Sequence, residues 1–337
     1  MVQKKKVILG ISCGDINGVG IEILLKAFSK KSLFNICVPV LYAPKKILDF
    51  YKTVKHIKEF HYNIIKSIDE ACDMQVNLID IYNKDFNIQL GTSTHSAGQI
   101  ALTSFNASIE ALKQKKIDAL VTLPINKKNI SFLEKTFTGH TEYLENKINA
   151  NSSLMLLVSK TLKIATATNH IPISKVSSTL NSDLLNQKIN ILIQSLIVDF
   201  LIDKPKVALL GLNPHAGDDG LIGCEDKDII APVVSKFYSR GHSVFGPYPA
   251  DGFFGSKKYI NFDAVLGMYH DQSLVPFKHI SFGGGVNYTA GLSVIRTSPD
   301  HGVAYDIAGK GLANENSFIE SIYLAVKIYI NRKSNLV

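Results

Sequence analysis

Short apolar runs alternate with amphipathic stretches along the chain, and this alternation predicts buried strands that are separated by helices. The runs typical of strands lie at residues 7–12, 38–42, 76–81, 119–123, 163–168, 264–266 and 292–295, with a further run that starts at residue 207. Apolar residues at helical spacing predict helices over residues 23–28, 44–54, 100–112 and 318–330. Strands and helices that alternate in this way favour right-handed βαβ units and a mainly parallel sheet.

Three of the apolar runs are each followed, within a few residues, by a histidine: His170, His215 and His270. In open α/β sheets the ligand crevice lies just beyond the carboxyl ends of the strands, so these side chains are expected to face a ligand. Imidazole is a common metal ligand, and three protein ligands with one open position are typical of a catalytic metal site. Because no local motif connects the three histidines, separate structural or hydrogen-bonding roles remain the alternative.

Carboxylates and cations near the same runs add further candidate chemistry. Asp251 and Asp271 are candidates for orienting a ligand or acting as a general base, with a solvated loop position as the alternative. Lys278 and Arg296 offer positive charge to an anionic substrate, and the planar arginine fork suits a carboxylate or phosphate. The glycine-rich loop of residues 14–20 has neither of the common phosphate-binding spacings, so a tight strand-to-helix turn explains it at least as well.

The composition is that of a globular enzyme. The 337 residues are 46% hydrophobic and 20% charged, which suits one large domain or two ordinary ones. The net charge of +8 comes from lysines scattered along the chain, among them the short basic run Lys127–Lys128, and this pattern disfavours nucleic-acid binding. The cysteines have no metal-binding spacing, and no apolar stretch suits a signal peptide or a membrane span, so a cytoplasmic protein with no membrane partner is expected.

Several motifs together resemble the 4-hydroxythreonine-4-phosphate dehydrogenase family of the vitamin B6 pathway. They are FTGHTE at residues 137–142, GLNPHAG at 211–217, PAD at 249–251, MYHDQ at 268–272, RTS at 296–298 and DHG at 300–302. The resemblance runs nearly from end to end of the chain. It implies that His170, His215 and His270 hold one divalent metal ion per subunit, with zinc, magnesium and cobalt as candidates.

The resemblance also implies roles for the remaining polar residues. The implied substrate contacts are His140, Thr141, Lys278, Asn287 and Arg296. Lys278, Asp251 and Asp271 are the candidate catalytic groups for proton transfer, and the sequence does not choose between them. The loop of residues 302–314 is similar to the cofactor loop of isocitrate and isopropylmalate dehydrogenases, which implies that NAD or NADP contacts His301, Gly302, Asp306 and Asn314.

The resemblance implies an α/β fold of two α/β/α subdomains with mainly parallel sheets and a cleft between them, similar to isocitrate and isopropylmalate dehydrogenases. The first subdomain is expected to comprise residues 1–125 plus 300–337, and the second residues 126–299 with the metal histidines. A homodimer with the active site at the subunit interface is also implied. The chain departs from the family at four positions. Ile16 and Ile21 stand where proline is common, Gly252 where threonine is common and Gly284 where arginine is common. Loop shape and charge near the substrate are therefore expected to differ.

The activity that the resemblance implies is NAD(P)-dependent oxidation and decarboxylation of 4-phosphooxy-L-threonine to 3-amino-2-oxopropyl phosphate, a step of pyridoxal phosphate biosynthesis. A metal at the histidines explains the residue types, because it lowers the pKa of the substrate hydroxyl and orients that group for hydride transfer. One alternative is a related dehydrogenase of a phosphorylated sugar acid such as 4-phosphoerythronate. Another is a metallohydrolase in which the histidines activate water.

Overall fold

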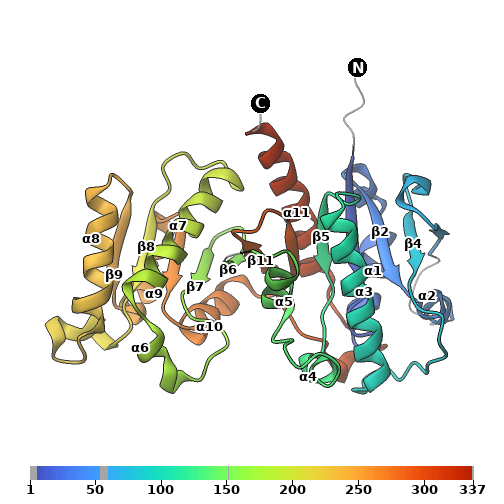
Figure 1. The fold of residues 1–337 in the computed structure, drawn as a ribbon, viewed down its shortest axis with the longest axis horizontal. Helices are drawn as coiled ribbons and strands as arrows, with labels where there is room; N and C mark the ends of the chain where they lie inside the picture. The colour runs from blue at the N-terminus through green and yellow to red at the C-terminus, as the bar shows by residue number, and fades with distance from the viewer. Residues whose placement is uncertain (1–5, 54–59, 151, 336–337) are drawn as a thin grey trace. The chain divides into compact units, whose positions relative to one another are not determined.

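The computed structural model describes residues 6–53, 60–150 and 152–335, and its contacts divide the chain into two compact units (Figure 1). The first unit comprises residues 1–151 and 293–330, and the second comprises residues 152–292 and 331–337. The boundaries expected from the sequence, after residue 125 and before residue 300, are not those of the contact-defined units and stay a prediction. No helix within the described ranges is long and apolar enough to cross a lipid bilayer.

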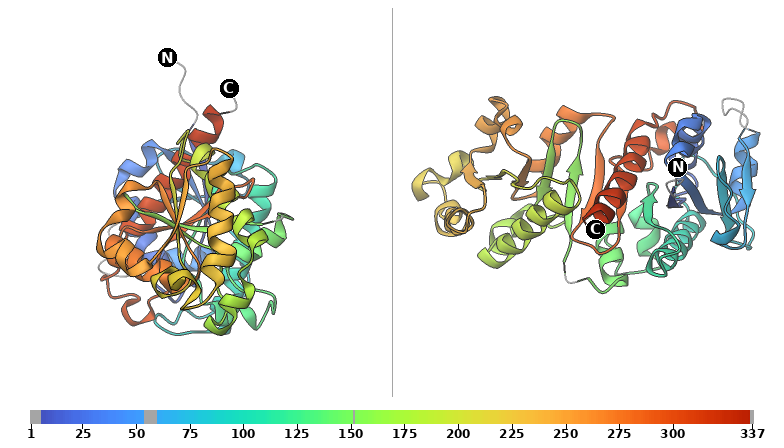
Figure 2. Two further views of the ribbon diagram at one scale, coloured as in Figure 1. Left: turned by 90° about the vertical axis from the view of Figure 1, so that its left-hand side faces the viewer. Right: turned by 90° about the horizontal axis from the view of Figure 1, so that it is seen from above.

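The sheet of the first unit runs β3-β4-β2-β1-β5-β12, and its neighbouring strands are parallel. The strands are β1 (Val7–Ser12), β2 (Cys37–Ala43), β3 (Tyr62–Ile64), β4 (Val76–Asp80), β5 (Ala119–Thr122) and β12 (Arg296–Pro299). The helices are α1 (Gly20–Ser29), α2 (Lys45–Lys52), α3 (His95–Lys113), α4 (Lys127–Ser131), α5 (His140–Lys147) and most of α11 (Asn316–Ser334). Helices α1 and α3 lie on opposite sides of these strands (Figure 2), so both faces of the sheet are buried.

The sheet of the second unit runs β11-β6-β7-β10-β8-β9. The strands are β6 (Leu154–Val158), β7 (Lys163–Thr166), β8 (Val207–Leu210), β9 (Val244–Tyr248), β10 (Ala264–Gly267) and β11 (Val286–Ala290). The helices are α6 (Val176–Thr179), α7 (Ser182–Val198), α8 (Ala231–Ser239), α9 (Ala250–Gly255) and α10 (His270–Ser281). Strands β7, β10, β8 and β9 are parallel, whereas β6 is antiparallel to both of its neighbours.

Most predicted elements agree with the structure, and the differences have local causes. The strand predicted at residues 292–295 is wrong, because pairing with β5 begins at Arg296 after a turn at Gly291, whose φ is 83°. Arg296 therefore lies inside a strand and not in the loop that follows one. The helix predicted at residues 44–54 is α2, but its predicted last residue lies outside the described residues. The mainly parallel α/β architecture is confirmed in each unit.

A buried polar cluster stabilises the end of the chain within the second unit. The Asp199 carboxylate, which is 2% exposed, accepts hydrogen bonds from Nε of Arg332 at 2.6 Å and from the Tyr288 hydroxyl at 2.5 Å. The side-chain amide of Asn331 donates to the backbone oxygen of Asp199 at 2.7 Å. Each partner of the buried carboxylate thus comes from a different part of the chain.

Replacing Arg332 with methionine should lower the free energy of unfolding by about 3 kcal/mol, because it leaves a buried carboxylate without its cation. Urea denaturation followed by circular dichroism measures this change. Lys327→Met is the matched control, since this exposed lysine lies on the same helix and should change stability by less than about 0.5 kcal/mol. Equal stabilities of the two variants would contradict the prediction.

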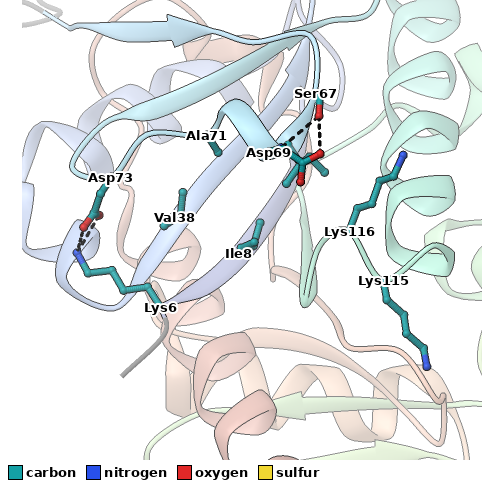
Figure 3. Close-up of a pocket in the computed structure, with 10 residues that line it drawn as sticks. Lys6, Ile8, Val38, Ser67, Asp69, Ala71, Asp73, Lys115 and Lys116 are labelled. Carbon is teal, nitrogen blue, oxygen red and sulfur yellow. Dashed lines mark hydrogen bonds and ion pairs between the residues drawn. The ribbon is translucent and has the colours of Figure 1, made fainter. Parts of the chain in front are cut away.

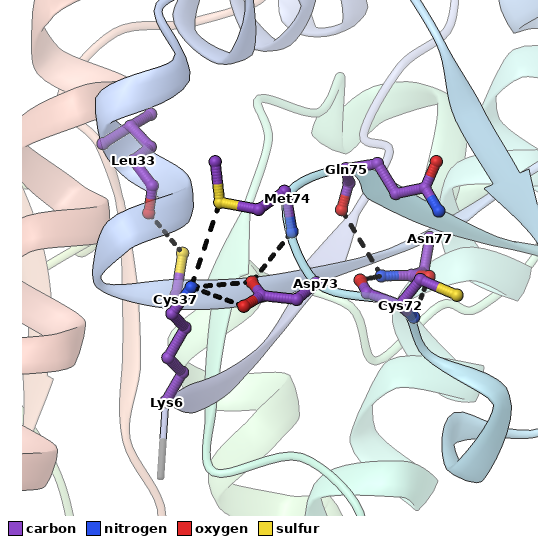
Figure 4. Close-up of polar contacts among 8 residues, drawn as sticks. All are labelled: Lys6, Leu33, Cys37, Cys72, Asp73, Met74, Gln75 and Asn77. Atoms are coloured by element: carbon purple, nitrogen blue, oxygen red, sulfur yellow. Dashed lines mark hydrogen bonds and ion pairs between the residues drawn. The ribbon is translucent and has the colours of Figure 1, made fainter. Parts of the chain in front are cut away.

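A pocket of about 620 Å³ lies at the amino ends of β1 and β2, and no predicted site residue lines it (Figure 3). Ile8 and Val38 contribute apolar walls, and the ion pair between Lys6 Nζ and Asp73 Oδ2 spans 2.6 Å at its edge (Figure 4). In parallel sheets the ligand crevice lies at the opposite, carboxyl ends of the strands. This pocket is therefore separate from the candidate site.

Candidate active site

The three predicted metal ligands follow three strands that are neighbours in the second unit. His170 follows β7, His270 follows β10 and His215 follows β8, and the sheet order is β7-β10-β8. The ring centroids of His170 and His270 lie 5.6 Å apart. The chain order of these strands differs from their order in the sheet, so only the tertiary structure places the His270 strand between the other two.

Hydrogen bonds tie these three strand ends to one another. The Thr168 backbone N–H and hydroxyl both donate to the backbone oxygen of Met268, at 3.2 Å and 2.7 Å. The Gln272 side-chain oxygen accepts from the Met268 N–H at 2.7 Å, and its amide nitrogen donates to the backbone oxygen of Gly211 at 2.6 Å. Sequence reasoning gave no role to Thr168 or Gln272, although Gln272 stands in the MYHDQ motif.

His170 and His270 lie close enough for both rings to bind one divalent metal ion. Nδ1 of His270 lies 2.6 Å from Oδ1 of Asp271, a contact that orients the ring and leaves Nε2 as the ring nitrogen available to a metal. Two imidazoles bound to one tetrahedral metal would have centroids roughly 5 Å apart, close to the observed separation. Within the described residues, however, no group of three or more histidine, cysteine, aspartate or glutamate side chains is arranged to hold a metal. The structure thus pairs two of the predicted ligands and places His215 at the next strand end.

His215 lies on a turn with unusual backbone geometry. Residues 215–219 all have positive φ, between 45° and 82°, inside the segment Pro214–Gly220. The His215 side chain is exposed. Left-handed residues other than glycine are strained, so surrounding contacts must hold this turn in its shape.

The structure places three further predicted residues of the second unit on two helices and one strand. Asp251 is exposed in the first turn of α9, and Lys278 is exposed on α10. Asn287 lies on β11, and its side-chain oxygen is buried without a hydrogen-bond partner. The proton-transfer and substrate roles of these three residues stay predictions.

In the first unit, a cationic cluster forms around the buried Arg296. This arginine is 2% exposed, and its Nε and Nη2 donate to the Thr122 hydroxyl at 3.1 Å and 2.6 Å. Burial lowers the pKa of Arg296 to about 9, and the Glu142 carboxylate opposes that effect. Burial also lowers the pKa of Lys127, with Glu142 raising it and Arg296 lowering it. The buried Arg296, the half-buried Glu142 and the exposed Lys127 therefore interact through two positive charges and one negative charge, and the cluster is net positive.

His140 belongs to the same cluster. Burial, followed by the charges of Arg296 and Lys127, holds the pKa of its imidazole well below the ordinary range, so the ring is neutral at pH 7. The ring packs edge-on against Phe105, with centroids 4.7 Å apart, and its Nε2 is buried without a hydrogen-bond partner. Thr141, the next predicted substrate contact, is 8% exposed in the first turn of α5.

The backbone at Gly139 lies close to the side chains of Glu142 and Lys127. A Cβ added there would lie 2.8 Å from Oε2 of Glu142 and 3.4 Å from Nζ of Lys127. Sequence reasoning identified His140, Thr141 and Arg296 but missed Glu142 and gave Lys127 only a general contribution of charge. The FTGHTE motif lies close to Lys127 only in the folded structure, so no local pattern in the sequence could have predicted this contact.

The predicted cofactor loop, residues 301–314, is held against α1 and the loop before it. Nζ of Lys26 donates to the backbone oxygens of Gly311 and Ala313, at 2.8 Å and 2.7 Å. Oε2 of Glu22 accepts from the Gly309 N–H at 3.0 Å. The loop backbone is therefore fixed by two side chains of one helix, which sequence reasoning did not identify.

A second anchor of the same loop is Tyr305. Its hydroxyl donates to Oδ2 of Asp15 at 2.7 Å and accepts from the Asn126 side chain at 3.2 Å. Burial raises the pKa of the Asp15 carboxyl, and the bond from Tyr305 opposes that effect. The predicted cofactor residues His301, Gly302, Asp306 and Asn314 all lie on this anchored loop, and their contacts with a cofactor stay predictions.

Known proteins resemble the chain over almost its whole length. The family model described as pyridoxal phosphate biosynthetic protein PdxA matches residues 35–325. A 4-hydroxythreonine-4-phosphate dehydrogenase of Bacteroides thetaiotaomicron is 41% identical over 333 residues, which are 98% of this chain and 91% of that protein. The 1.25 Å crystal structure of 4-hydroxythreonine-4-phosphate dehydrogenase from Klebsiella pneumoniae has a TM-score of 0.83 and 30% identity, over 97% of this chain and 99% of that chain.

A more distant likeness concerns the fold alone. The crystal structure of a β-decarboxylating dehydrogenase from Thermococcus kodakarensis has a TM-score of 0.50 and 10% identity, over 98% of this chain and 88% of that chain. The fold class predicted from the sequence is thereby confirmed.

Proposed function

The chain belongs to the PdxA family of pyridoxal phosphate biosynthetic proteins, and on that basis we propose that it is a 4-hydroxythreonine-4-phosphate dehydrogenase. The reaction is the oxidation of the C3 hydroxyl of 4-phosphooxy-L-threonine by NAD(P)+, followed by loss of the carboxyl group as CO2. The products are 3-amino-2-oxopropyl phosphate, NAD(P)H and CO2. The observation that carries the proposal is the 41% identity to a dehydrogenase of this name over 98% of the chain.

The cationic cluster around the buried Arg296 of the first unit is suited to the anionic groups of this substrate. A phosphate monoester carries up to two negative charges at pH 7, and a net positive, poorly hydrated region strengthens its hydrogen bonds. Arg296 contributes a planar donor fork, and Nε2 of His140 is a buried atom that still lacks a partner. Lys278 and Asn287 of the second unit are proposed as further substrate contacts.

His170, His215 and His270 would hold the divalent metal ion. A bound metal polarises the substrate hydroxyl for oxidation and the resulting ketone for decarboxylation. Asp271 orients the His270 ring through its 2.6 Å contact with Nδ1. Asp251, Asp271 and Lys278 remain the candidates for proton transfer.

The loop of residues 301–314 is proposed to bind the nicotinamide cofactor. Its anchors, Lys26, Glu22 and Tyr305, hold the loop backbone in place before any ligand arrives, which lowers the entropy lost on binding. The choice between NAD and NADP, the identity of the metal and the homodimer with an interfacial active site stay predictions.

Purified protein supplied with NAD(P)+, a divalent metal and 4-phosphooxy-L-threonine should release NAD(P)H and CO2 in equal amounts. Absorbance at the nicotinamide band and trapping of CO2 measure the two products. The matched substrate control is 4-phosphoerythronate, which should react at least about tenfold more slowly if the proposal is correct. Faster turnover of 4-phosphoerythronate would favour the sugar-acid alternative, and hydrolysis without NAD(P)H formation would favour the metallohydrolase.

A further inference from the structure

We propose that Asp226 is a positioning residue that holds the left-handed turn carrying His215 in the shape needed for metal binding. The inference rests on the proposed metal site. It assigns a function to a buried carboxylate that touches neither the predicted ligands nor the substrate residues in any described contact.

The Asp226 carboxylate is the centre around which the start of this turn is folded. It is 1% exposed and accepts three hydrogen bonds. Oδ1 accepts from the Leu212 N–H at 2.8 Å, and Oδ2 accepts from both the N–H and the side-chain amide of Asn213, each at 3.0 Å. These donors lie two and three residues before His215, between the end of β8 and the turn.

The glycines of the GLNPHAG motif pack directly against the same carboxylate. A Cβ added at Gly211 would lie 2.8 Å from Oδ1 of Asp226, and one added at Gly217 would lie 3.2 Å from its Cβ. Gly211 and Gly217 flank His215 in the sequence, so the peptide that carries the ligand wraps around Asp226. A side chain at either glycine would therefore collide with Asp226 or with the backbone beside it.

This arrangement explains how the chain tolerates the backbone geometry of the turn. His215, Ala216, Asp218 and Asp219 are non-glycine residues with φ between 45° and 55°. Each such residue costs of order 1 kcal/mol, so a run of them persists only where surrounding contacts fix it. Asp226 supplies three such contacts from outside the turn, and it also begins a π-helical segment, Asp226–Ile230, a rare geometry that is frequent at functional sites.

A carboxylate is the group that this position requires. Its neighbours are three N–H donors, and an uncharged amide would direct its own N–H2 toward at least one of them. Replacement by asparagine therefore keeps the volume of the side chain but removes part of the hydrogen bonding. The turn should then sample other conformations in which His215 no longer reaches the metal together with His170 and His270.

The test is a titration of the metal-free full chain with Co2+ or Zn2+, for wild type, Asp226→Asn and the control Asp228→Asn. Asp228 is exposed on the same segment, and its side chain has no described partner. We expect metal affinity to fall about 10- to 100-fold in Asp226→Asn and to stay within about twofold in Asp228→Asn. Excess metal should restore most of the kcat of Asp226→Asn, which a general loss of folded structure would not allow.

Three results would overturn the inference. The first is wild-type metal affinity in a folded Asp226→Asn protein, while His270→Ala binds poorly; this would leave the proposed function intact. The second is a loss of kcat that excess metal does not restore. The third is a wild-type protein that binds neither metal, which would remove the metal site from the proposed function as well. If Asp226→Asn does not fold, Asn213→Ala removes one of the three bonds and should weaken metal binding several-fold, and unchanged affinity there would count against the inference.

Discussion

Replacing His270 with alanine should abolish stoichiometric metal binding and lower kcat/KM by about a thousandfold. The metal is proposed to stabilise negative charge on the reacting oxygen, and losing about 4 kcal/mol of that stabilisation corresponds to a thousandfold in rate. His270 is the informative choice, because its ring lies 5.6 Å from that of His170 and its Nδ1 is engaged by Asp271. Isothermal titration with Co2+ and initial rates of NAD(P)H formation measure the two effects.

The matched control for this variant is His279→Ala. His279 is exposed on the same helix, α10, and has no described partner, so its removal should change neither metal binding nor rate by more than about twofold. Thermal unfolding of both variants checks that α10 is intact. Metal-dependent turnover near the wild-type rate in His270→Ala would contradict the proposal that His270 is one of three histidine ligands of the metal.

The second large effect is expected at Arg296. Arg296→Met should raise the KM for 4-phosphooxy-L-threonine about 100-fold, because a charge-assisted, two-point contact with an anion contributes about 3 kcal/mol. The free energy of unfolding of Arg296→Met should stay the same as that of the wild type or rise. Burying a guanidinium is costly, and an apolar side chain of similar length in its place is often neutral or stabilising. Lys127 remains beside Glu142 to balance that carboxylate.

Initial rates as a function of substrate concentration and urea denaturation test the two halves of this prediction. Arg240→Met, at an exposed position of the second unit, is the control and should leave KM unchanged. Arg296→Lys keeps the charge but loses the planar fork, so its KM should still rise about tenfold. An Arg296→Met protein with wild-type KM would remove this cluster from substrate binding, whereas loss of stability with normal KM would make the arginine a purely structural residue.

The two predictions address different units of the protein, and their failures are therefore separable. If His270→Ala loses metal binding but Arg296→Met keeps the wild-type KM, only the role proposed for the first-unit cluster is wrong. If Arg296→Met raises KM but His270→Ala still binds metal, only the role proposed for the three strand ends of the second unit is wrong. The further inference about Asp226 depends only on the metal site, so it survives a failure at Arg296.

Local patterns in the sequence were sufficient for the fold class and for the ligand-bearing strands. Apolar runs at β1, β5, β7, β8 and β10 are short and bounded by polar or glycine residues, which is the signature of buried parallel strands. Histidines just past three of them were visible for the same reason. The strands β6 and β11 were missed, although β6 is an apolar run, and the antiparallel direction of β6 could not have been predicted from such a run in any case.

Contacts between distant residues could not be predicted in this way. The sequence identified His140 and Arg296 by motif, but it could not indicate that burial keeps the first neutral and lowers the pKa of the second to about 9. The start of β12 at Arg296 was also misplaced, because its pairing with β5 is set by a segment more than 170 residues away in the chain (Arg296 pairs with Leu120). Desolvation and long-range charge are properties of the packed structure.

The sequence by itself determined the alternation of strands and helices, the residue types that suit a metal and an anion, and the membership of a family. It did so because hydrophobic periodicity and motif identity are local properties of the chain. The tertiary structure alone decided that β10 lies between β7 and β8, that Thr168 and Gln272 join their ends, and that Asp226 binds the segment just before the turn of His215. These features depend on strand order and on hydrogen bonds between segments far apart in the chain, and no local pattern encodes either.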